Sequence, residues 1–199
     1  MFEAQVKRYK SLNALAEQGG IVILGCGEDV NIPLCELRQA FSIESRLYNR
    51  SISGLHVADA IRVYDECVAP LAPDTVLLHL GAEDLDGFTS DSASFDRNYR
   101  ALIEHIRATT PGCEVAVVSV ANYDGDARLA ELNRHLGYIA ESEQCKLGDI
   151  SERRVWNPKE TKRVMAFVSA WSFGRRADER KPFYDLVKIL FCNGATVGA

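Results

Sequence analysis

Three short segments of the chain hold the residue types that could do chemistry, and each follows an apolar run. The segments are GCGED at residues 25–29, NRSISGLH at residues 49–56 and GAED at residues 81–84. A thiol beside an imidazole can act as a nucleophile with its base, and a backbone N–H at a helix start can stabilise an oxyanion. Carboxylates with an imidazole can bind a divalent cation. The spacing of these residues decides which of these chemistries the chain supports.

The glycines of the first segment do not form a nucleotide-binding turn. A dinucleotide fingerprint needs the spacing G-x-G-x-x-G, with the third glycine leading into a helix. Here Gly25 and Gly27 are present, but Val30 occupies the third position and Pro33 follows soon after. The segment is therefore only a weak indication of a nucleotide site, and we expect no cofactor.

Apolar periodicity predicts the elements that position these segments. Short apolar runs predict five strands, at residues 21–26, 45–49, 75–80, 114–120 and 146–148. Helical spacing of apolar residues predicts helices within residues 57–71, 95–106, 129–139 and 164–171. The continuous runs TVLLHL and EVAVVSV are typical of strands buried on both faces of a parallel sheet. We expect a flavodoxin-like, three-layer α/β/α sandwich with a five-stranded parallel sheet, whose ligand crevice lies beyond the carboxyl ends of the strands.

Composition narrows the class of partner. The chain has 199 residues, 47% of them hydrophobic, and no low-complexity tract, so we expect one domain over residues 1–199. The net charge is −5, and no long block of lysine and arginine occurs. This balance argues against binding to nucleic acid or to an anionic membrane, and it favours a small-molecule or protein partner.

The lack of a recognisable targeting signal and the spacing of the cysteines favour a reducing compartment. The first twenty residues mix charged and apolar side chains and lack the apolar core of a signal peptide, and no segment approaches a membrane span. The six cysteines are scattered singly, with no CxxC pair, so neither a zinc site nor a disulfide framework is indicated. We therefore expect a cytoplasmic protein.

The order and spacing of the three segments resemble the SGNH hydrolases, the GDSL-type esterases and lipases. VILGCGED resembles that family's first block, YNRSISGLHVAD its second and PDTVLLHLGAEDL its third. The resemblance covers about residues 20–170. Residues 1–19 are expected to form an N-terminal helix and residues 172–199 a C-terminal helical extension. The resemblance implies the fold of an esterase or acylhydrolase that works through a serine and a histidine.

Most of the residues on which that chemistry depends differ in this chain. The resemblance places Gly27 at the nucleophilic serine, Glu83 at the asparagine of the oxyanion hole and Val155 at the histidine. Gly54 matches the oxyanion glycine. A carboxylate at position 83 accepts hydrogen bonds only, so it would repel a developing oxyanion. We therefore predict a small-molecule-binding or regulatory relative without serine-esterase activity.

The first block allows a second register, in which Asp29 takes the nucleophile position. That register would place Gly25 inside a longer strand, where glycine is unfavourable, so we prefer Gly27. Acidic residues then surround the site, which favours cationic or polyhydroxylated ligands. The residues expected to line the crevice beside Gly27, Gly54 and Glu83 are Glu28, Asp29, Asp84, Val155 and Trp156. Trp156 alternatively packs against the last helix.

Two alternatives concern chemistry. An active esterase or acyltransferase would use Cys26 as nucleophile with His56 as base, whereas the simpler interpretation makes Cys26 a buried packing residue. A metal site would draw on the carboxylates and imidazole of the three segments, but their spacing fits no metal motif. Its ligands would come from Glu28, Asp29, His56, Glu83 and Asp84. His79, inside the run VLLHL, is expected to be a hydrogen-bonded core histidine.

A third alternative is a protein-interaction module. The segment from residue 172 onward carries an apolar stripe at Phe183, Leu186, Val187, Leu190 and Phe191. Packing of this stripe against its own domain is the first expectation. Assembly into a homo-oligomer through the C-terminal segment is the alternative.

Overall fold

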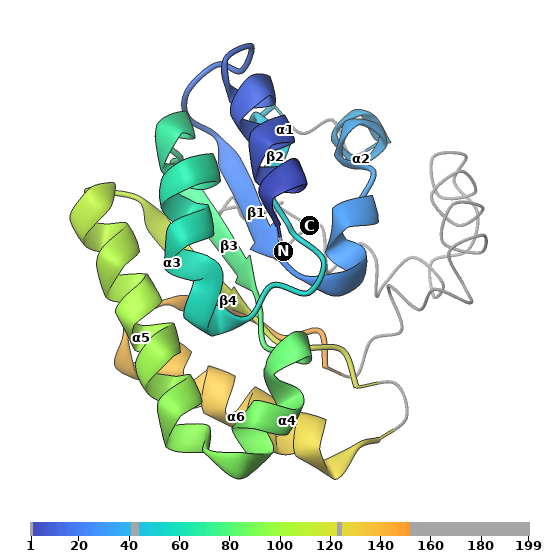
Figure 1. Cartoon of the computed structure of the whole chain (residues 1–199), viewed down its shortest axis with the longest axis vertical. Helices are drawn as coiled ribbons and strands as arrows, with labels where there is room; N and C mark the ends of the chain where they lie inside the picture. Colours follow the sequence, from blue (N-terminus) through green and yellow to red (C-terminus); the bar gives the residue numbers. More distant parts are fainter. Residues whose placement is uncertain (1, 41–43, 123–124, 152–199) are drawn as a thin grey trace, which may run out of the picture.

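The computed structural model describes residues 2–40, 44–122 and 125–151, and its centre is a five-stranded parallel sheet (Figure 1). The strand order is β2-β1-β3-β4-β5. The strands are β1 (Ile21–Gly25), β2 (Leu47–Asn49), β3 (Thr75–His79), β4 (Glu114–Val118) and β5 (Lys146–Gly148). In register, Ile21 lies beside both Leu47 and Thr75. The predicted flavodoxin-like sheet is confirmed, because this is the strand order of that fold.

Three strands end earlier than their apolar runs suggest. The runs continue to Cys26, Leu80 and Val120, whereas the strands end at Gly25, His79 and Val118. All three later residues are nevertheless buried. The apolar pattern therefore reports burial at the carboxyl edge of the sheet and not strand pairing.

Helices alternate with the strands as predicted, with two additions. Helices α2 (Leu34–Ala40) and α4 (Leu85–Ser90) are too short to give a periodic signal, and the sequence did not predict them. The predicted helix at residues 57–71 is a series of short helical turns: η2 (Val57–Asp59), α3 (Ala60–Val63), the π turn η3 (Tyr64–Val68) and η4 (Ala69–Leu71). The longer helices are α1 (Glu3–Asn13), α5 (Ser92–Thr109) and α6 (Ala127–Ser142).

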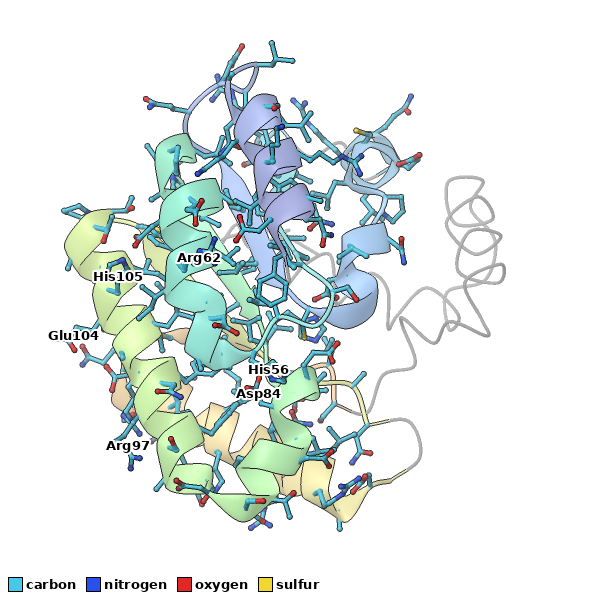
Figure 2. The ribbon with its side chains drawn as sticks, viewed as in Figure 1. His56, Arg62, Asp84, Arg97, Glu104 and His105 are labelled. Atoms are coloured by element: carbon cyan, nitrogen blue, oxygen red, sulfur yellow. The ribbon has the colours of Figure 1, made fainter. Side chains whose placement is uncertain are left out.

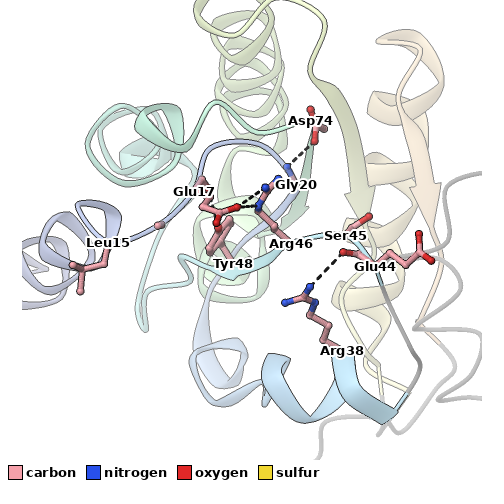
Figure 3. Close-up of a pocket in the computed structure, with 10 residues that line it drawn as sticks. Leu15, Glu17, Gly20, Arg38, Glu44, Ser45, Arg46, Tyr48 and Asp74 are labelled. Carbon is pink, nitrogen blue, oxygen red and sulfur yellow. Dashed lines mark hydrogen bonds and ion pairs between the residues drawn. The ribbon is translucent and has the colours of Figure 1, made fainter.

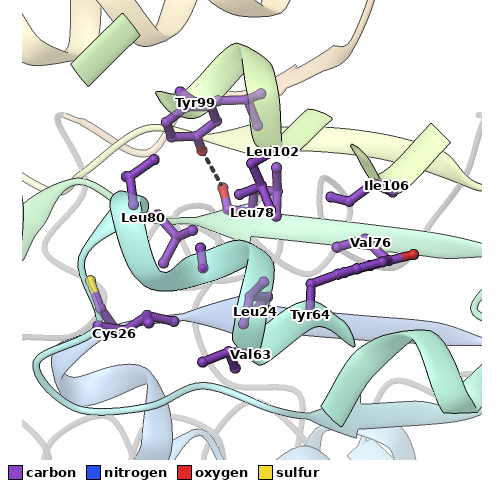
Figure 4. Close-up of a cluster of buried hydrophobic side chains, with 14 of the residues drawn as sticks. Leu24, Cys26, Val63, Tyr64, Val76, Leu78, Leu80, Tyr99, Leu102 and Ile106 are labelled. Atoms are coloured by element: carbon purple, nitrogen blue, oxygen red, sulfur yellow. Dashed lines mark hydrogen bonds between the residues drawn. The ribbon is translucent and has the colours of Figure 1, made fainter. Parts of the chain in front are cut away.

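Both faces of the sheet are buried, as a layered sandwich requires. On one face, Val22, Leu24, Val76 and Leu78 form a cluster with side chains from α1, α3 and α5. Figure 4 shows Leu24, Val76 and Leu78 of this cluster together with side chains of α3 and α5. The alternate residues, such as Ile23 and Leu77, point to the opposite face and are equally buried. This double burial explains the uninterrupted apolar runs.

Helix α5 shows how the sequence builds one layer. The Asp91 carboxylate caps it by accepting the backbone N–H of Ser94 at 3.0 Å. One stripe of the helix is buried against the sheet at three- and four-residue spacing: Phe95, Tyr99, Leu102, Ile103 and Ile106. The Tyr99 hydroxyl donates to the carbonyl of Leu78 at 3.3 Å, which joins α5 to β3 (Figure 4).

The three chemically rich segments meet at the carboxyl edge of the sheet. The backbone N–H of Ile52 donates to the carbonyl of Gly25 at 3.0 Å, and that of Val57 donates to the Asp84 carboxylate at 3.2 Å. Two further turns follow the strands there, η1 (Gly27–Asn31) after β1 and η5 (Ala82–Asp84) after β3. The predicted helix at 164–171 and the predicted extension at 172–199 lie outside the described residues. The predicted single domain over residues 1–199 is therefore described only in part.

Candidate functional site

Gly27 faces a carboxylate. Gly27 opens η1 with φ +54°, and a side chain built on it would begin 3.5 Å from Oε1 of Glu83. Glu83 is exposed on η5, and its carboxylate makes no hydrogen bond or ion pair with the described residues. Gly27 therefore leaves open space in front of the Glu83 carboxylate, whose negative charge is available to a ligand.

An imidazole and a carboxylate stand beside Glu83. His56 Nδ1 lies 3.3 Å from Oδ1 of Asp84 (Figure 2). Both oxygens of Asp84 also accept the backbone N–H of Val57 at 3.2 Å. Burial raises the pKa of Asp84, although the hydrogen bond from Val57 and the nearby His56 oppose the rise. His56 itself is half exposed, so a ligand can reach it.

These residues line a cavity of about 430 Å³ between η2, η5, α4 and α5. The wall includes the acidic residues Glu83, Asp84, Asp86 and Asp91 together with His56. Polar Ser94 and Asn98 and the rings of Phe88 and Phe95 complete it. The half-buried amide of Asn98 has no hydrogen-bond partner among the described residues. A cavity with a few uncommitted polar groups and an apolar wall is the usual form of a ligand site.

Gly54 offers a backbone donor at the same edge. It has φ +73°, a conformation that favours glycine, and no atom lies within 4 Å of the place where a side chain would begin. Its N–H donates to none of the residues that the structure describes. The donor expected from the sequence is thus free to meet a ligand.

Cys26 has the surroundings of a packing residue. Its side chain is buried at the rim of the apolar cluster (Figure 4), and its thiol donates to the carbonyl of His79 at 3.7 Å. Burial, and next the negative charge of Asp29, raise the pKa of the thiol to about 12. Because the thiolate is the reactive form, these surroundings disfavour Cys26 as a nucleophile.

Asp29 is buried beneath the turn and does not line the cavity. Its two oxygens lie 3.0 and 2.8 Å from Nδ1 of His79, and the residue is 4% exposed. Burial tends to lower the pKa of His79, but the charge and hydrogen bond of Asp29, with the backbone of Ser119, raise it overall. The prediction that His79 is a hydrogen-bonded core histidine is confirmed, with a partner that the sequence did not identify.

The buried carboxylate also explains Gly25. A side-chain carbon built on Gly25 would lie 2.0 Å from Oδ2 of Asp29, so the last residue of β1 must be glycine for Asp29 to fold inward. Sequence reasoning missed this pair. The signal was a histidine inside an apolar run together with an aspartate four residues after a glycine.

The candidate metal ligands whose side chains the structure describes do not converge on one point. Asp29 is committed to His79, whereas His56 and Asp84 pair with each other. Among the described residues, no group of three or more histidine, cysteine, aspartate or glutamate side chains could hold a metal ion. The side chain of Glu28, and the whole of Val155 and Trp156, lie outside the described part of the structure.

A larger cavity, of about 600 Å³, lies at the amino ends of the strands (Figure 3). Its charged groups are largely committed to one another. Arg46 pairs with Glu17, and the Asp74 carboxylate accepts the N–H of Gly20 at 2.6 Å. Because open parallel sheets bind ligands at the carboxyl ends of their strands, the cavity beside Glu83 is the better candidate.

The family is settled by comparison with known proteins. A family model described as the GDSL-like lipase/acylhydrolase family matches residues 33–168, more than half of the chain. The chain belongs to this family. The match to the GDSL-like family begins after the turn that holds Gly27, so the alignment of Gly27 with the family's serine stays a prediction.

Solved structures of GDSL-like proteins share the fold. A GDSL-like lipase from Bacteroides thetaiotaomicron is 18% identical, with a TM-score of 0.63 over 92% of this chain and 95% of that one. A psychrotrophic esterase from Pseudoalteromonas sp., solved with monoethylphosphonate as inhibitor, is 19% identical, with a TM-score of 0.62 over 89% and 100%. At such identities the likeness shows the fold alone. No curated protein matches the chain.

The described helices include none with the length and apolar character needed to cross a membrane.

Proposed function

We propose that this GDSL-family protein binds a small molecule and lacks serine-esterase activity. The observation that carries the proposal is the approach of Glu83 to Gly27, where a nucleophile's side chain would begin 3.5 Å from a carboxylate oxygen. Glycine supplies no hydroxyl, and a carboxylate accepts hydrogen bonds without donating them. An ester's developing oxyanion would therefore be repelled at this place.

The same groups favour a cationic or polyhydroxylated ligand. The uncommitted carboxylate of Glu83 suits an ammonium group, and the free amide of Asn98 suits a hydroxyl. The Phe88 ring offers an apolar surface to the body of the ligand. We propose an amine-bearing polyol as the ligand class.

Three sugars that share one ring test this charge preference. Glucosamine, glucose and glucuronate carry a positive, zero and negative charge when the amine is protonated, below neutral pH. We expect thermal-shift and calorimetric binding to rank glucosamine above glucose and to detect no binding of glucuronate. Glu83→Gln should weaken glucosamine binding about tenfold, the factor that corresponds to roughly 1.4 kcal/mol.

The matched control is Glu104→Gln, on an exposed glutamate of α5 that has no partner among the described residues (Figure 2). This change should leave the ranking of the sugars as it is. A preference for glucuronate, or equal loss of glucosamine binding in both variants, would contradict the proposal.

The second candidate function is an esterase that uses Cys26 with His56. The burial of Cys26, the raised pKa of its thiol and the pairing of His56 with Asp84 all weigh against it. We expect no turnover of short-chain nitrophenyl esters above the buffer rate. Turnover that iodoacetamide and Cys26→Ala abolish, while Cys35→Ala at an exposed cysteine leaves it intact, would establish the esterase instead.

A further inference from the structure

A chain of polar contacts crosses the carboxyl edge of the sheet through all five strands. The Asn49 side-chain amide, at the end of β2, donates to the Asp29 carbonyl at 2.7 Å. The Asp29 carboxylate, just beyond β1, bonds His79 at the end of β3. His79 contacts the backbone of Ser119, beyond β4, and the Ser119 hydroxyl donates to Asp149 beyond β5 at 2.9 Å. The Asp29–His79 pair is the central link.

This link requires a charge. Asp29 is 4% exposed, and a buried carboxylate without a counter-charge is strongly destabilising. A protonated His79 supplies that counter-charge at hydrogen-bond distance. Loss of the histidine's proton would leave the hydrogen bond but remove the compensation.

The pair joins η1, which holds Gly27, to the end of β3, which leads into the turn that holds Glu83. Asp29 lies inside η1, where its N–H donates to the Cys26 carbonyl and its carbonyl accepts the N–H of Ile32, both at 3.1 Å. His79 ends β3, and Glu83 lies on the turn that follows. The position of Gly27 relative to Glu83 therefore depends on how η1 is held against the end of β3.

We propose that Asp29 and His79 are positioning residues, whose charged pair clamps η1 to the end of β3 and fixes the approach of Gly27 to Glu83. The clamp holds while His79 carries its proton. This inference does not depend on the identity of the ligand or on the absence of esterase activity.

The direction of the pH dependence follows from the raised pKa of His79. A group whose pKa is higher in the folded than in the unfolded protein stabilises the fold fully at pH values below its unfolded-state pKa, which is about 6.5 for histidine. This stabilisation is lost as the pH rises through the folded-state pKa, which is raised for His79. Other titratable groups on the neighbouring elements are Cys26, Glu83, Asp84 and Asp149. Burial raises the pKa of the Cys26 thiol to about 12, so the thiol stays neutral over this range, and burial also raises the pKa of Asp84. The clamp should therefore loosen as the pH rises above about 6.5 and through the higher folded-state pKa of His79.

Hydrogen exchange measured by NMR tests positioning directly. Protection factors, which already correct for base-catalysed exchange, are compared for the Asp29 and Ile32 amides of the turn and for the amides of α5. In the wild-type protein, turn protection should fall about tenfold as pH rises, the factor expected for a hydrogen bond to a charged group, while α5 stays protected. The side-chain ¹⁵N shifts of His79 should report its deprotonation over the same pH range.

Variants separate the clamp from general stability. His79→Gln should lower turn protection at every pH and abolish its pH dependence. His105→Gln, on the partly exposed pair with Asp65, is the control and should change neither. The double variant Asp29→Asn with His79→Gln joins two neutral amides and should restore part of the protection without pH dependence.

Two results would overturn the proposal. One is a wild-type turn whose protection keeps its value across the titration of His79. The other is equal loss of protection in the turn and in α5, because a pair that only stabilises the whole fold would act on both. The wild-type pH series remains decisive even if His79→Gln fails to fold.

Discussion

At the scale of single residues, the site is defined by what two glycines leave out. Gly25 leaves the space into which the Asp29 carboxylate folds, and Gly27 leaves an open position in front of Glu83. The first glycine is required by a close approach and the second by φ +54° together with its missing side chain. Neither requirement involves a nucleotide, although both glycines belong to the Gly-x-Gly pattern.

Gly25→Ala tests the close approach. The added carbon would lie 2.0 Å from Asp29 Oδ2, so the carboxylate must move or β1 must shift. We expect a loss of about 1–3 kcal/mol in the free energy of unfolding by urea, as for other overpacked sites. Gly87→Ala on α4, where no atom lies within 4 Å, is the control and should stabilise by about 0.5–1 kcal/mol. A neutral Gly25→Ala would contradict this account of Asp29.

At the scale of elements, short-range signals place the helices that form the cavity. Helix α5 supplies Ser94, Phe95 and Asn98 to the cavity wall, and its start is fixed by the Asp91 cap. Its buried stripe holds the remaining length against β3 and α3. The position of the cavity wall therefore depends on a cap that lies in the same wall.

Asp91→Ala tests the cap. Removing the acceptor leaves the Ser94 N–H unpaired at the first turn of α5, and we expect a loss of about 1 kcal/mol in the free energy of unfolding. Glu104→Ala, on the exposed face of the same helix, should cause little change. Equal effects of the two substitutions in urea denaturation would show that the cap does not stabilise the helix.

At the scale of the whole molecule, one sheet covered on both faces brings distant segments to a common edge. The chain of polar contacts that starts at Asn49 and ends at Asp149 runs along the carboxyl ends of the strands, and the candidate cavity lies beside it. The larger cavity lies at the amino ends of the strands, where Arg46 pairs with Glu17 (Figure 3). Assembly through residues 172–199 and a cytoplasmic location stay predictions.

The sequence by itself determined the strands, the longer helices and the resemblance to GDSL-type hydrolases. These features depend on local periodicity and on the order of segments, which are readable along the chain. Short α2 and α4 escaped because fewer than two turns give no periodic signal. The sequence also placed Gly54, Glu83 and Asp84 at strand ends, where the structure has them.

Only the tertiary structure decided which of these residues touch. Asp29 and His79 are 50 positions apart, and their pairing depends on β1 lying next to β3 and on the inward fold of η1. In the folded chain, Asp29 lies outside the crevice and the thiol of Cys26 is buried. Glu83 faces Gly27. Burial and charge compensation are properties of contacts between distant segments, so no pattern of neighbouring residues could have fixed them.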